Sequence, residues 1–370
     1  MPAEVAGGGA ALEDAAAPVR RGEELPLGPL AEYLRQRLPE AGVAVDPAAP
    51  LVIEQFPSGW SNLTYLLRLG DVELVLRRPP FGNVVATAHD MAREHRVLSR
   101  LSAVWPLAPR PHLFADERSV LGVPFYVMER RRGLILRSGL PPGLDLPPER
   151  ARALSTALAD GLASLHAIDP GAAGLAELGR AEGYAERQVL GWSERYRRSA
   201  TDDHPPLLAV MEWLAEHIPP DTGPALVHND YKYDNLVLDP ADPTRILAVL
   251  DWEMATLGDP LMDLGTTLGY WVEADDPEPL RAFALGPTAL PGSLTRAELA
   301  QRYAERTGAD LSNLLVYYVY GLFKIAVIVQ QIHARYRAGK TRDPRFAGLS
   351  EVVGLYGAVA AAAIETDRLG

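Results

Sequence analysis

The sequence predicts an α+β protein built from a small antiparallel sheet domain and a larger, mainly helical domain. Short β-rich runs separated by turn residues fill the first third of the chain, whereas helical periodicity dominates after residue 147. A linker-like composition of Arg, Gly and Pro separates the two textures over residues 130–143. We therefore expect a disordered Ala- and Gly-rich tail over residues 1–25, a sheet domain over 26–131 and a helical domain over 132–370.

The first domain is expected to contain five strands. Gly70 and Asp71 form a pair that is typical of a tight hairpin between two β-rich runs. In chain order, the expected elements are a helix over 28–38, strands over 51–56, 63–69 and 72–76, a helix over 86–101, and strands over 111–115 and 123–128. This order predicts a five-stranded antiparallel sheet with a helix inserted before its last two strands.

The second domain is expected to be mainly helical, with one hairpin. Apolar runs at 236–238 and 246–250 predict the two strands of this hairpin. Asp259 followed by Pro260 has the pattern of a helix start, with the Asp side chain as the N-cap. Helical periodicity covers residues 148–165, 181–198, 207–217, 261–271, 295–307, 311–337 and 349–367.

Composition excludes several classes of protein. The 370 residues carry 48 acidic and 36 basic side chains, and the net charge of −12 argues against nucleic acid as a partner. The absence of cysteine excludes disulfides, thiolate metal sites and cysteine nucleophiles. The apolar stretch 314–332 has Lys324 at its centre, which predicts a buried helix of a soluble protein and no membrane partner. Because the N-terminal residues also lack the apolar core of a secretory signal, we expect a cytoplasmic protein.

A cluster of polar residues in the second domain has the spacing of a phosphotransfer site. His228, Asp230 and Asn235 fall at the offsets of the motif H-x-D-x-x-x-x-N, in which the Asp meets the acceptor hydroxyl and the Asn binds magnesium. Asp251, after the next apolar run, stands in the place of a second metal ligand. Magnesium bound to ATP requires such oxygen ligands, and a separate carboxylate is needed to orient the attacking hydroxyl. By contrast, Asp239 and the residues around it are interpreted as turn formers.

These segments resemble the aminoglycoside phosphotransferase and choline kinase-like family, which belongs to the protein-kinase-like superfamily. The resemblance rests on VHNDYKYDNLVLDP, AVLDWEMATLGDPLMDLG, SGWSNLTYLL, ELVLRRPP and AREHRVLSRL, and it is strongest for the branch of kinase domains fused to acyl-CoA dehydrogenases. It implies a two-lobed kinase-like fold, ATP and Mg²⁺ as cofactors, Asp230 as the catalytic base, and Asn235 and Asp251 as magnesium ligands. Glu253 is implied to assist at the metal or to support its loop, and Asp263 to brace the catalytic loop.

The same resemblance implies a set of nucleotide-binding residues. Arg77 stands where the family has a lysine on the third strand, and Glu94 matches the glutamate that pairs with it. Met128 and Glu129 resemble the hinge whose backbone contacts adenine. Ahead of the second strand, a loop with a single glycine is implied to cover the phosphates, through Ser58, Gly59, Ser61 and Asn62.

Three functions remain open from the sequence. The first is an ATP-dependent kinase that transfers the γ-phosphoryl group to a hydroxyl of a small molecule, such as a hydroxyacyl-CoA or related metabolite. The second is an aminoglycoside or amino-sugar kinase, which the acidic net charge favours. The third is a nucleotide-binding pseudokinase that serves as a partner module, because Arg77 and Asn229 depart from the lysine and glycine of the family.

Overall fold

The computed structural model describes residues 13–57, 62–81, 90–116, 118–341 and 344–370. Contacts divide the chain into two compact units. The first contains residues 1–134, 237–241 and 247–255, and the second contains residues 135–236, 242–246 and 256–370. The first unit therefore includes a later part of the chain, the segment around Asp251, in addition to the N-terminal sheet.

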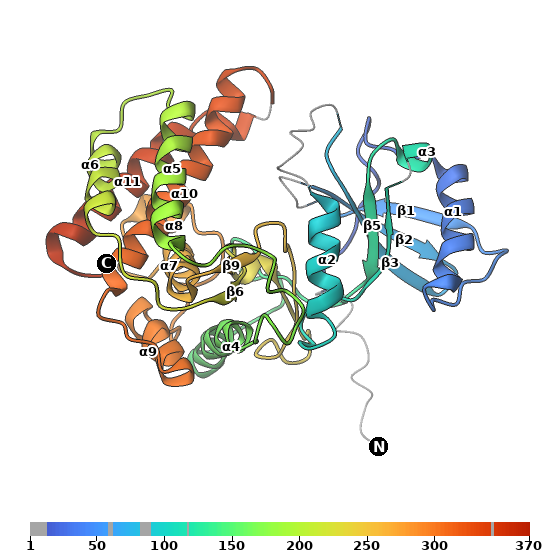
Figure 1. Cartoon of the computed structure of the whole chain (residues 1–370), viewed down its shortest axis with the longest axis horizontal. Coiled ribbons are helices and arrows are strands. Elements are labelled where there is room, and N and C mark those ends of the chain that lie inside the picture. The colour runs from blue at the N-terminus through green and yellow to red at the C-terminus, as the bar shows by residue number, and fades with distance from the viewer. Residues whose placement is uncertain (1–12, 58–61, 82–89, 117, 342–343) are drawn as a thin grey trace. The chain divides into compact units, whose positions relative to one another are not determined.

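The first unit is built on a five-stranded antiparallel sheet with the strand order β1-β2-β3-β5-β4. Its elements are α1 (Leu27–Glu40), β1 (Leu51–Gln55), β2 (Leu63–Leu69), β3 (Val72–Arg78), α2 (Met91–Leu101), β4 (Pro111–Ala115), α3 (Arg118–Leu121) and β5 (Phe125–Glu129). Helices α1 and α2 lie on opposite sides of the sheet (Figure 1). The predicted sheet is confirmed, and the short α3 is an element that the sequence pattern did not predict.

Alternation along β3 decides which side chains face each helix. Leu74 and Leu76 belong to the apolar core that the sheet forms with α1. Because successive side chains of a strand point to opposite faces, Arg77 points to the other face, toward α2. On that face Arg77 meets Glu94 of α2, and this contact places a buried cation beneath the sheet.

The segment before α1 differs from the disordered tail expected over residues 1–25. Residues 1–12 lie outside the described residues, but Ala17 forms an antiparallel bridge with Gln55, with both backbone hydrogen bonds present. The reason is that β1 is an edge strand, whose outer backbone groups need a partner. Leu25 is also buried in the core beneath α1.

The second unit is mainly helical. Its helices are α4 (Pro148–His166), α5 (Tyr184–Ser199), α6 (Pro205–Glu216), α7 (Pro260–Tyr270), α8 (Glu278–Ala282), α9 (Arg296–Thr307), α10 (Leu314–Arg337) and α11 (Leu349–Thr366), together with the one-turn 3₁₀ helices η1 (Tyr233–Asn235) and η2 (Pro344–Phe346). Strand β6 (Ala225–Val227) pairs with β9 (Thr256–Gly258) in this unit. The predicted hairpin consists of β7 (Leu236–Leu238) and β8 (Ile246–Val249), and most of its residues belong to the first unit.

Helix α10 is the central helix of this unit and packs against α7, α11, α5 and α6. Its backbone comes very close to that of α7, because a Cβ atom built on Gly265 would lie 2.1 Å from the Tyr317 carbonyl oxygen. A Cβ atom on Gly321 would lie 2.0 Å from the Gly265 carbonyl oxygen. This close approach sets the position, along the axes of α7 and α10, of the polar residues that contact the loop after β6.

Two helices are long and apolar enough to span a membrane by composition, within the described residues. They are Leu314–Arg337 and Pro344–Thr366, and 72% of the apolar window of the first is buried inside the protein. Most of α10 is therefore core, as expected from the position of Lys324 in the sequence.

Candidate active site

The loop that follows β6 is held by a buried carboxylate. Asp263 on α7 accepts hydrogen bonds from the backbone N–H groups of His228 (2.6 Å) and Asn229 (2.7 Å). The ring of His166 contacts the same carboxylate at 3.1 Å and the Tyr303 hydroxyl at 2.7 Å. Burial would raise the pKa of Asp263, but its hydrogen bonds to the His166 ring and to the His228 backbone N–H hold the pKa below its ordinary value. The loop is thus held by an ionised carboxylate.

Asn229 has a left-handed backbone conformation, with φ of 67°. Asparagine tolerates this region better than most residues, so it can adopt the turn at the position where the resemblance implies a glycine. The side-chain amide nitrogen of Asn229 donates a hydrogen bond of 3.0 Å to the Tyr184 hydroxyl of α5. The backbone carbonyl oxygen of Asn229 accepts a hydrogen bond of 2.7 Å from Lys324 of α10. A buried lysine usually needs a carboxylate partner, but the nearest partner of the Lys324 ammonium group is this backbone carbonyl.

The Asp230 carboxylate receives donors from several directions. Asn235 donates from its amide nitrogen to Asp230 Oδ2 at 2.8 Å, and Lys232 forms an ion pair with the same oxygen. The Tyr270 hydroxyl also bonds this carboxylate. Burial would raise the pKa of Asp230, but the charge and hydrogen bond of Lys232 hold the pKa below its ordinary value. Asp230 is therefore ionised at neutral pH. Because the Asn235 nitrogen is bonded to Asp230, the Asn235 amide oxygen is the atom suited to a metal ion.

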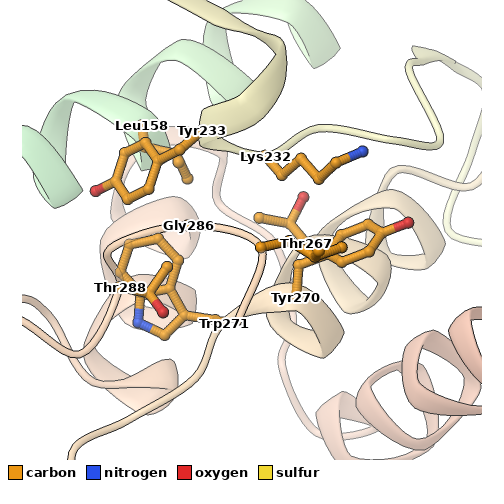
Figure 2. A pocket seen from close by; sticks show the side chains of 9 residues that line it. Leu158, Lys232, Tyr233, Thr267, Tyr270, Trp271, Gly286 and Thr288 are labelled. Carbon is orange, nitrogen blue, oxygen red and sulfur yellow. The ribbon is translucent and has the colours of Figure 1, made fainter. Parts of the chain in front are cut away.

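A small pocket lies beside this carboxylate within the helical unit. It is narrow and partly open to solvent, and its free volume of about 10 Å³ is roughly that needed for one water molecule. Figure 2 shows the Lys232 side chain extending over the Tyr270 ring, with Tyr233 and Trp271 at the other end of the pocket. The lining residues are Leu158, Lys232, Tyr233, Thr267, Tyr270, Trp271, Leu285, Gly286 and Thr288, of which Lys232 is the only charged one.

A second group of predicted site residues lies in the sheet unit. The guanidinium of Arg77 has its Nη2 atom 3.0 Å from Asp251, 3.4 Å from Glu94 and 3.9 Å from Glu253. Burial disfavours the charge on Arg77, but Glu94 and Asp251 raise its pKa well above the ordinary value. Asn62 donates from its amide nitrogen to Glu253 at 2.8 Å. Five residues predicted from separate parts of the sequence are thus brought together.

The segment after β8 presents two acids on either side of a buried tryptophan. Trp252 is buried, donates its indole N–H to the Val249 carbonyl at 2.8 Å, and packs edge-on against Trp105. Asp251 has φ of 67° and its side chain remains 31% exposed. The anchored tryptophan therefore fixes a sharp turn that directs the Asp251 carboxylate toward Arg77 and leaves it accessible.

Of the other residues predicted to contact the nucleotide, the structure describes only those at the hinge. Ser58, Gly59 and Ser61 lie outside the described residues. At the predicted hinge, Met128 pairs with Val75 in the sheet, and the Glu129 backbone N–H donates to the Arg110 carbonyl at 2.9 Å. The Glu129 N–H is therefore already hydrogen-bonded within the protein. Adenine would have to bond other backbone groups of this segment.

The sequence assigned no role at the loop around Asp230 to Lys232 or Tyr270, and it did not indicate which residue Lys324 would bond. Lys232 and Tyr270 both bond Asp230, and Lys324 bonds the residue before it. Lys232 lies inside the motif itself, two positions after Asp230, so its position was a signal that could have been used. His166, for which the sequence indicates only surface or core packing, is buried, and its ring also supports Asp263. Tyr270 and Lys324 have no local signal, because long-range packing brings them to the loop.

Comparison with known sequences identifies a family. The profile of the phosphotransferase enzyme family matches residues 52–299. Acyl-CoA dehydrogenase family member 11 of Rattus norvegicus is 37% identical over 314 residues, which are 84% of this chain and 39% of that protein. Acyl-CoA dehydrogenase family member 10 of Mus musculus is 33% identical over 325 residues, 87% of this chain and 30% of that protein. The chain thus spans well under half the length of these relatives.

Comparison with solved structures identifies the fold. A candidate aminoglycoside phosphotransferase of Ralstonia eutropha JMP134 is 29% identical, with a TM-score of 0.76 over 93% of this chain and 99% of that one. Choline kinase of Cryptosporidium parvum Iowa II is 13% identical, with a TM-score of 0.64 over 91% of this chain and 96% of that one. An aminoglycoside phosphotransferase bound to GDP and kanamycin is 17% identical, with a TM-score of 0.59 over 89% and 98% of the two chains. The fold is therefore the predicted kinase-like one.

Proposed function

Because this chain belongs to the phosphotransferase enzyme family, we propose that it transfers the γ-phosphoryl group of ATP to a hydroxyl group of a small molecule. The observation that carries this proposal is the Asp230 carboxylate, which is ionised and held by Asn235 and Lys232 on a loop that Asp263 fixes. A binding module would not need such a carboxylate. The following steps assign a role to each side chain.

Asp230 orients the acceptor and receives its proton. The acceptor hydroxyl donates a hydrogen bond to Asp230 as its oxygen approaches the γ-phosphorus. The new oxygen–phosphorus bond forms, the bond to the bridging oxygen of ADP breaks, and the hydroxyl proton passes to the carboxylate. A carboxylate with a lowered pKa is a weak base, so its main contribution is orientation, as expected for phosphoryl transfer with a loose transition state.

The donor atoms suit magnesium. We assign Asn235 and Asp251 as its ligands, with Glu253 in support. An amide oxygen and an accessible carboxylate are hard oxygen donors, and Mg²⁺ is usually bound by one or two carboxylates plus water and substrate phosphates. When bound, magnesium neutralises the charge of the transferring phosphates.

Arg77 is assigned to the nucleotide phosphates. Its guanidinium is held by Glu94 from α2, in the way the family lysine is held, and arginine can bind phosphate oxygens bidentately. Asn62 joins this group through Glu253. Ser58, Gly59 and Ser61 are proposed to complete the phosphate loop, and Met128 and Glu129 to border adenine. These assignments follow from the family resemblance and stay predictions.

The pocket chemistry favours one acceptor class over another. Among the nine lining residues, aromatic and hydroxyl groups surround a single cation, Lys232. An amino sugar would need carboxylates to receive its ammonium groups, whereas an acyl compound offers apolar surface and carbonyl or carboxylate oxygens. We therefore propose a hydroxyacyl-CoA or related metabolite as the acceptor, in line with relatives named as acyl-CoA dehydrogenase family members. An aminoglycoside kinase is the alternative, favoured by the net charge of −12.

The pseudokinase alternative is favoured by Arg77 and Asn229. The conformation of Asn229 weakens this alternative. Its backbone has the left-handed conformation that a glycine would adopt there, and its side chain is hydrogen-bonded to Tyr184.

We also propose that the protein acts in the cytoplasm, where ATP and magnesium are available, without nucleic acid or a membrane as partner.

Two measurements test the proposed function. Thermal unfolding is followed with ATP plus magnesium, ATP plus a chelator, and GTP plus magnesium, because a ligand at 100 times its dissociation constant stabilises a protein by about 2.7 kcal/mol. We expect a stabilisation of a few degrees that requires magnesium. ADP release is then screened with hydroxyacyl-CoAs, free hydroxy acids and kanamycin. Binding of ATP without ADP release from any acceptor would favour the pseudokinase, and release with kanamycin alone would favour the amino-sugar kinase.

A further inference from the structure

The peptide unit that joins Asn229 to Asp230 is bonded at both ends. Its carbonyl oxygen accepts the 2.7 Å hydrogen bond from Lys324, and its N–H group, which belongs to Asp230, donates to His228 Nδ1 at 3.2 Å. Rotation of this peptide unit would turn the Cα–Cβ bond of Asp230 and move the carboxylate. The two hydrogen bonds therefore fix the direction in which Asp230 points.

Lys324 is an unusual residue for its place on α10. Its side chain is 1% exposed, and the residues beside it in the sequence, Phe323 and Ile325, are buried apolar ones. Besides the Asn229 carbonyl, its ammonium group contacts the Asn229 side-chain oxygen at 3.3 Å and the Thr266 hydroxyl at 3.5 Å. Burying an ammonium group without a bonded carboxylate is costly, and a methionine would fill similar space without that cost. The ammonium group therefore serves something other than packing.

We infer that Lys324 is a positioning residue that sets the orientation of the Asp230 carboxylate by holding the Asn229 carbonyl in the left-handed turn. The inference rests on the proposed role of Asp230. Lys324 takes no part in the chemistry itself, since its hydrogen bonds go to Asn229 and Thr266.

The surroundings of Lys324 indicate how this role depends on pH. Burial lowers the pKa of Lys324 to about 8, while Asp263 of α7 and Asp230 oppose this shift and Lys232 and Arg195 of α5 add to it. Tyr184 of α5, which bonds the Asn229 side chain, has its pKa raised above the range of interest by burial. Below pH 8 Lys324 is charged and is the stronger donor to the Asn229 carbonyl. The wild-type rate should therefore decline as pH rises through about 8.

The test compares Lys324→Met with a matched control on the same helix, Gln330→Met. Gln330 is also fully buried, but its side-chain N–H groups donate to the Ser199 carbonyl at 2.7 Å and the Thr201 hydroxyl at 3.0 Å, away from the catalytic loop. We expect Lys324→Met to lower kcat about 10- to 100-fold, because small misplacements of a catalytic group have effects of this size, with the KM for ATP changed less than about twofold. The decline in rate near pH 8 should also disappear. Equal loss of kcat in the two variants, or an unchanged kcat in Lys324→Met, would overturn the inference.

A second readout does not depend on turnover. Backbone hydrogen exchange at His228, Asn229 and Asp230 is measured in the nucleotide-free protein for both variants. We expect exchange at these amides to be about 5- to 13-fold faster in Lys324→Met than in Gln330→Met, since this is the factor that corresponds to the loss of one hydrogen bond of about 1 to 1.5 kcal/mol. If the wild type phosphorylates no acceptor, the proposed function fails. The exchange rates of these amides still show whether Lys324 holds the loop. Equal exchange in the two variants would refute the positioning role.

Discussion

Arg77 Nη2 lies 3.0 Å from Asp251 Oδ1, although the two residues are 174 positions apart in the chain. The same guanidinium contacts the buried Glu94 at 3.4 Å, so one arginine joins the third strand, the helix after it and the segment after β8. All three belong to the sheet unit. This cation is therefore both a proposed phosphate-binding group and a structural link within its unit.

Replacing Arg77 by methionine should destabilise the protein strongly. The substitution leaves Glu94 buried without its cation, and breaking a buried ion pair on one side costs about 3 to 5 kcal/mol. The double variant Arg77→Met, Glu94→Met should recover part of this loss, because no buried charge of that pair remains unpaired. Urea unfolding of the wild type, both single variants and the double variant measures the four free energies. A double variant as unstable as the sum of the single ones would contradict the coupling.

Asp230→Ala should abolish most turnover while sparing nucleotide binding. A positioned base contributes about 100- to 10,000-fold to a rate, and Asp230 makes its bonds to Lys232, Tyr270 and Asn235 within the helical unit. The stabilisation by ATP and magnesium should remain. Asp242→Ala is a suitable control, because Asp242 is a half-exposed carboxylate that pairs with Arg150 and Thr244 on a turn outside the catalytic loop. Unchanged turnover in Asp230→Ala would remove its catalytic role.

The sequence predicted the local parts of this site well. The spacing of Asp230 and Asn235 is short, and a one-turn 3₁₀ helix is enough to bring the Asn235 amide to the Asp230 carboxylate. The strands were predicted because alternation and turn residues are local signals, and β2 and β4 have the expected bounds. Residues 13–25 carry no local signal of order, because the strand partner of Ala17, Gln55 at the edge of the sheet, lies more than 30 residues later.

Contacts set by helix packing had no such signal. Lys324 reaches Asn229 across 95 positions, and this contact depends on the close approach of Gly265 and Gly321 between α7 and α10. Neither glycine has a positive φ, so their role is the absence of a side chain rather than backbone freedom. A sequence pattern shows that α10 is apolar, but it does not show which of its residues faces the catalytic loop.

The contact between α7 and α10 gives a prediction on stability. Gly265→Ala places a methyl group 2.1 Å from a backbone oxygen, which cannot move without shifting α10. Overpacking of this kind costs about 1 to 3 kcal/mol, and the shift should also lower turnover because Lys324 and Asp263 lie on the two helices. Gly28→Ala in α1 is the control, since nothing lies within 4 Å of the place its methyl group would take and helical alanine is neutral or stabilising. Thermal unfolding of both variants decides the matter.

The acid limb of stability should depend on Asp263. Its pKa is lowered in the folded protein, so it stabilises the fold above the unfolded value of about 3.9, and this contribution is lost as pH falls through the folded pKa. Asp263→Asn should be less stable than the wild type at pH 7, because an amide oxygen is a weaker acceptor for the N–H groups of His228 and Asn229. The difference between the two proteins should shrink as pH falls below about 4. Urea unfolding between pH 3 and pH 7 measures it, and a constant difference would contradict this role.

Lys232 should control the acid limb of activity. Its ammonium group is the main favourable charge that keeps the pKa of Asp230 below its ordinary value against burial. In Lys232→Met, burial is opposed less, the pKa of Asp230 rises, and a larger fraction of Asp230 is protonated at a given acidic pH. Only the ionised carboxylate can accept the hydrogen bond and the proton of the substrate hydroxyl. The pH below which kcat falls should therefore be higher in Lys232→Met than in the wild type. The profile of kcat between pH 4 and pH 8 is compared with that of Arg137→Met, whose cation pairs with Asp234 in η1. An acid limb that stays in place in Lys232→Met would show that Lys232 does not set the charge of Asp230.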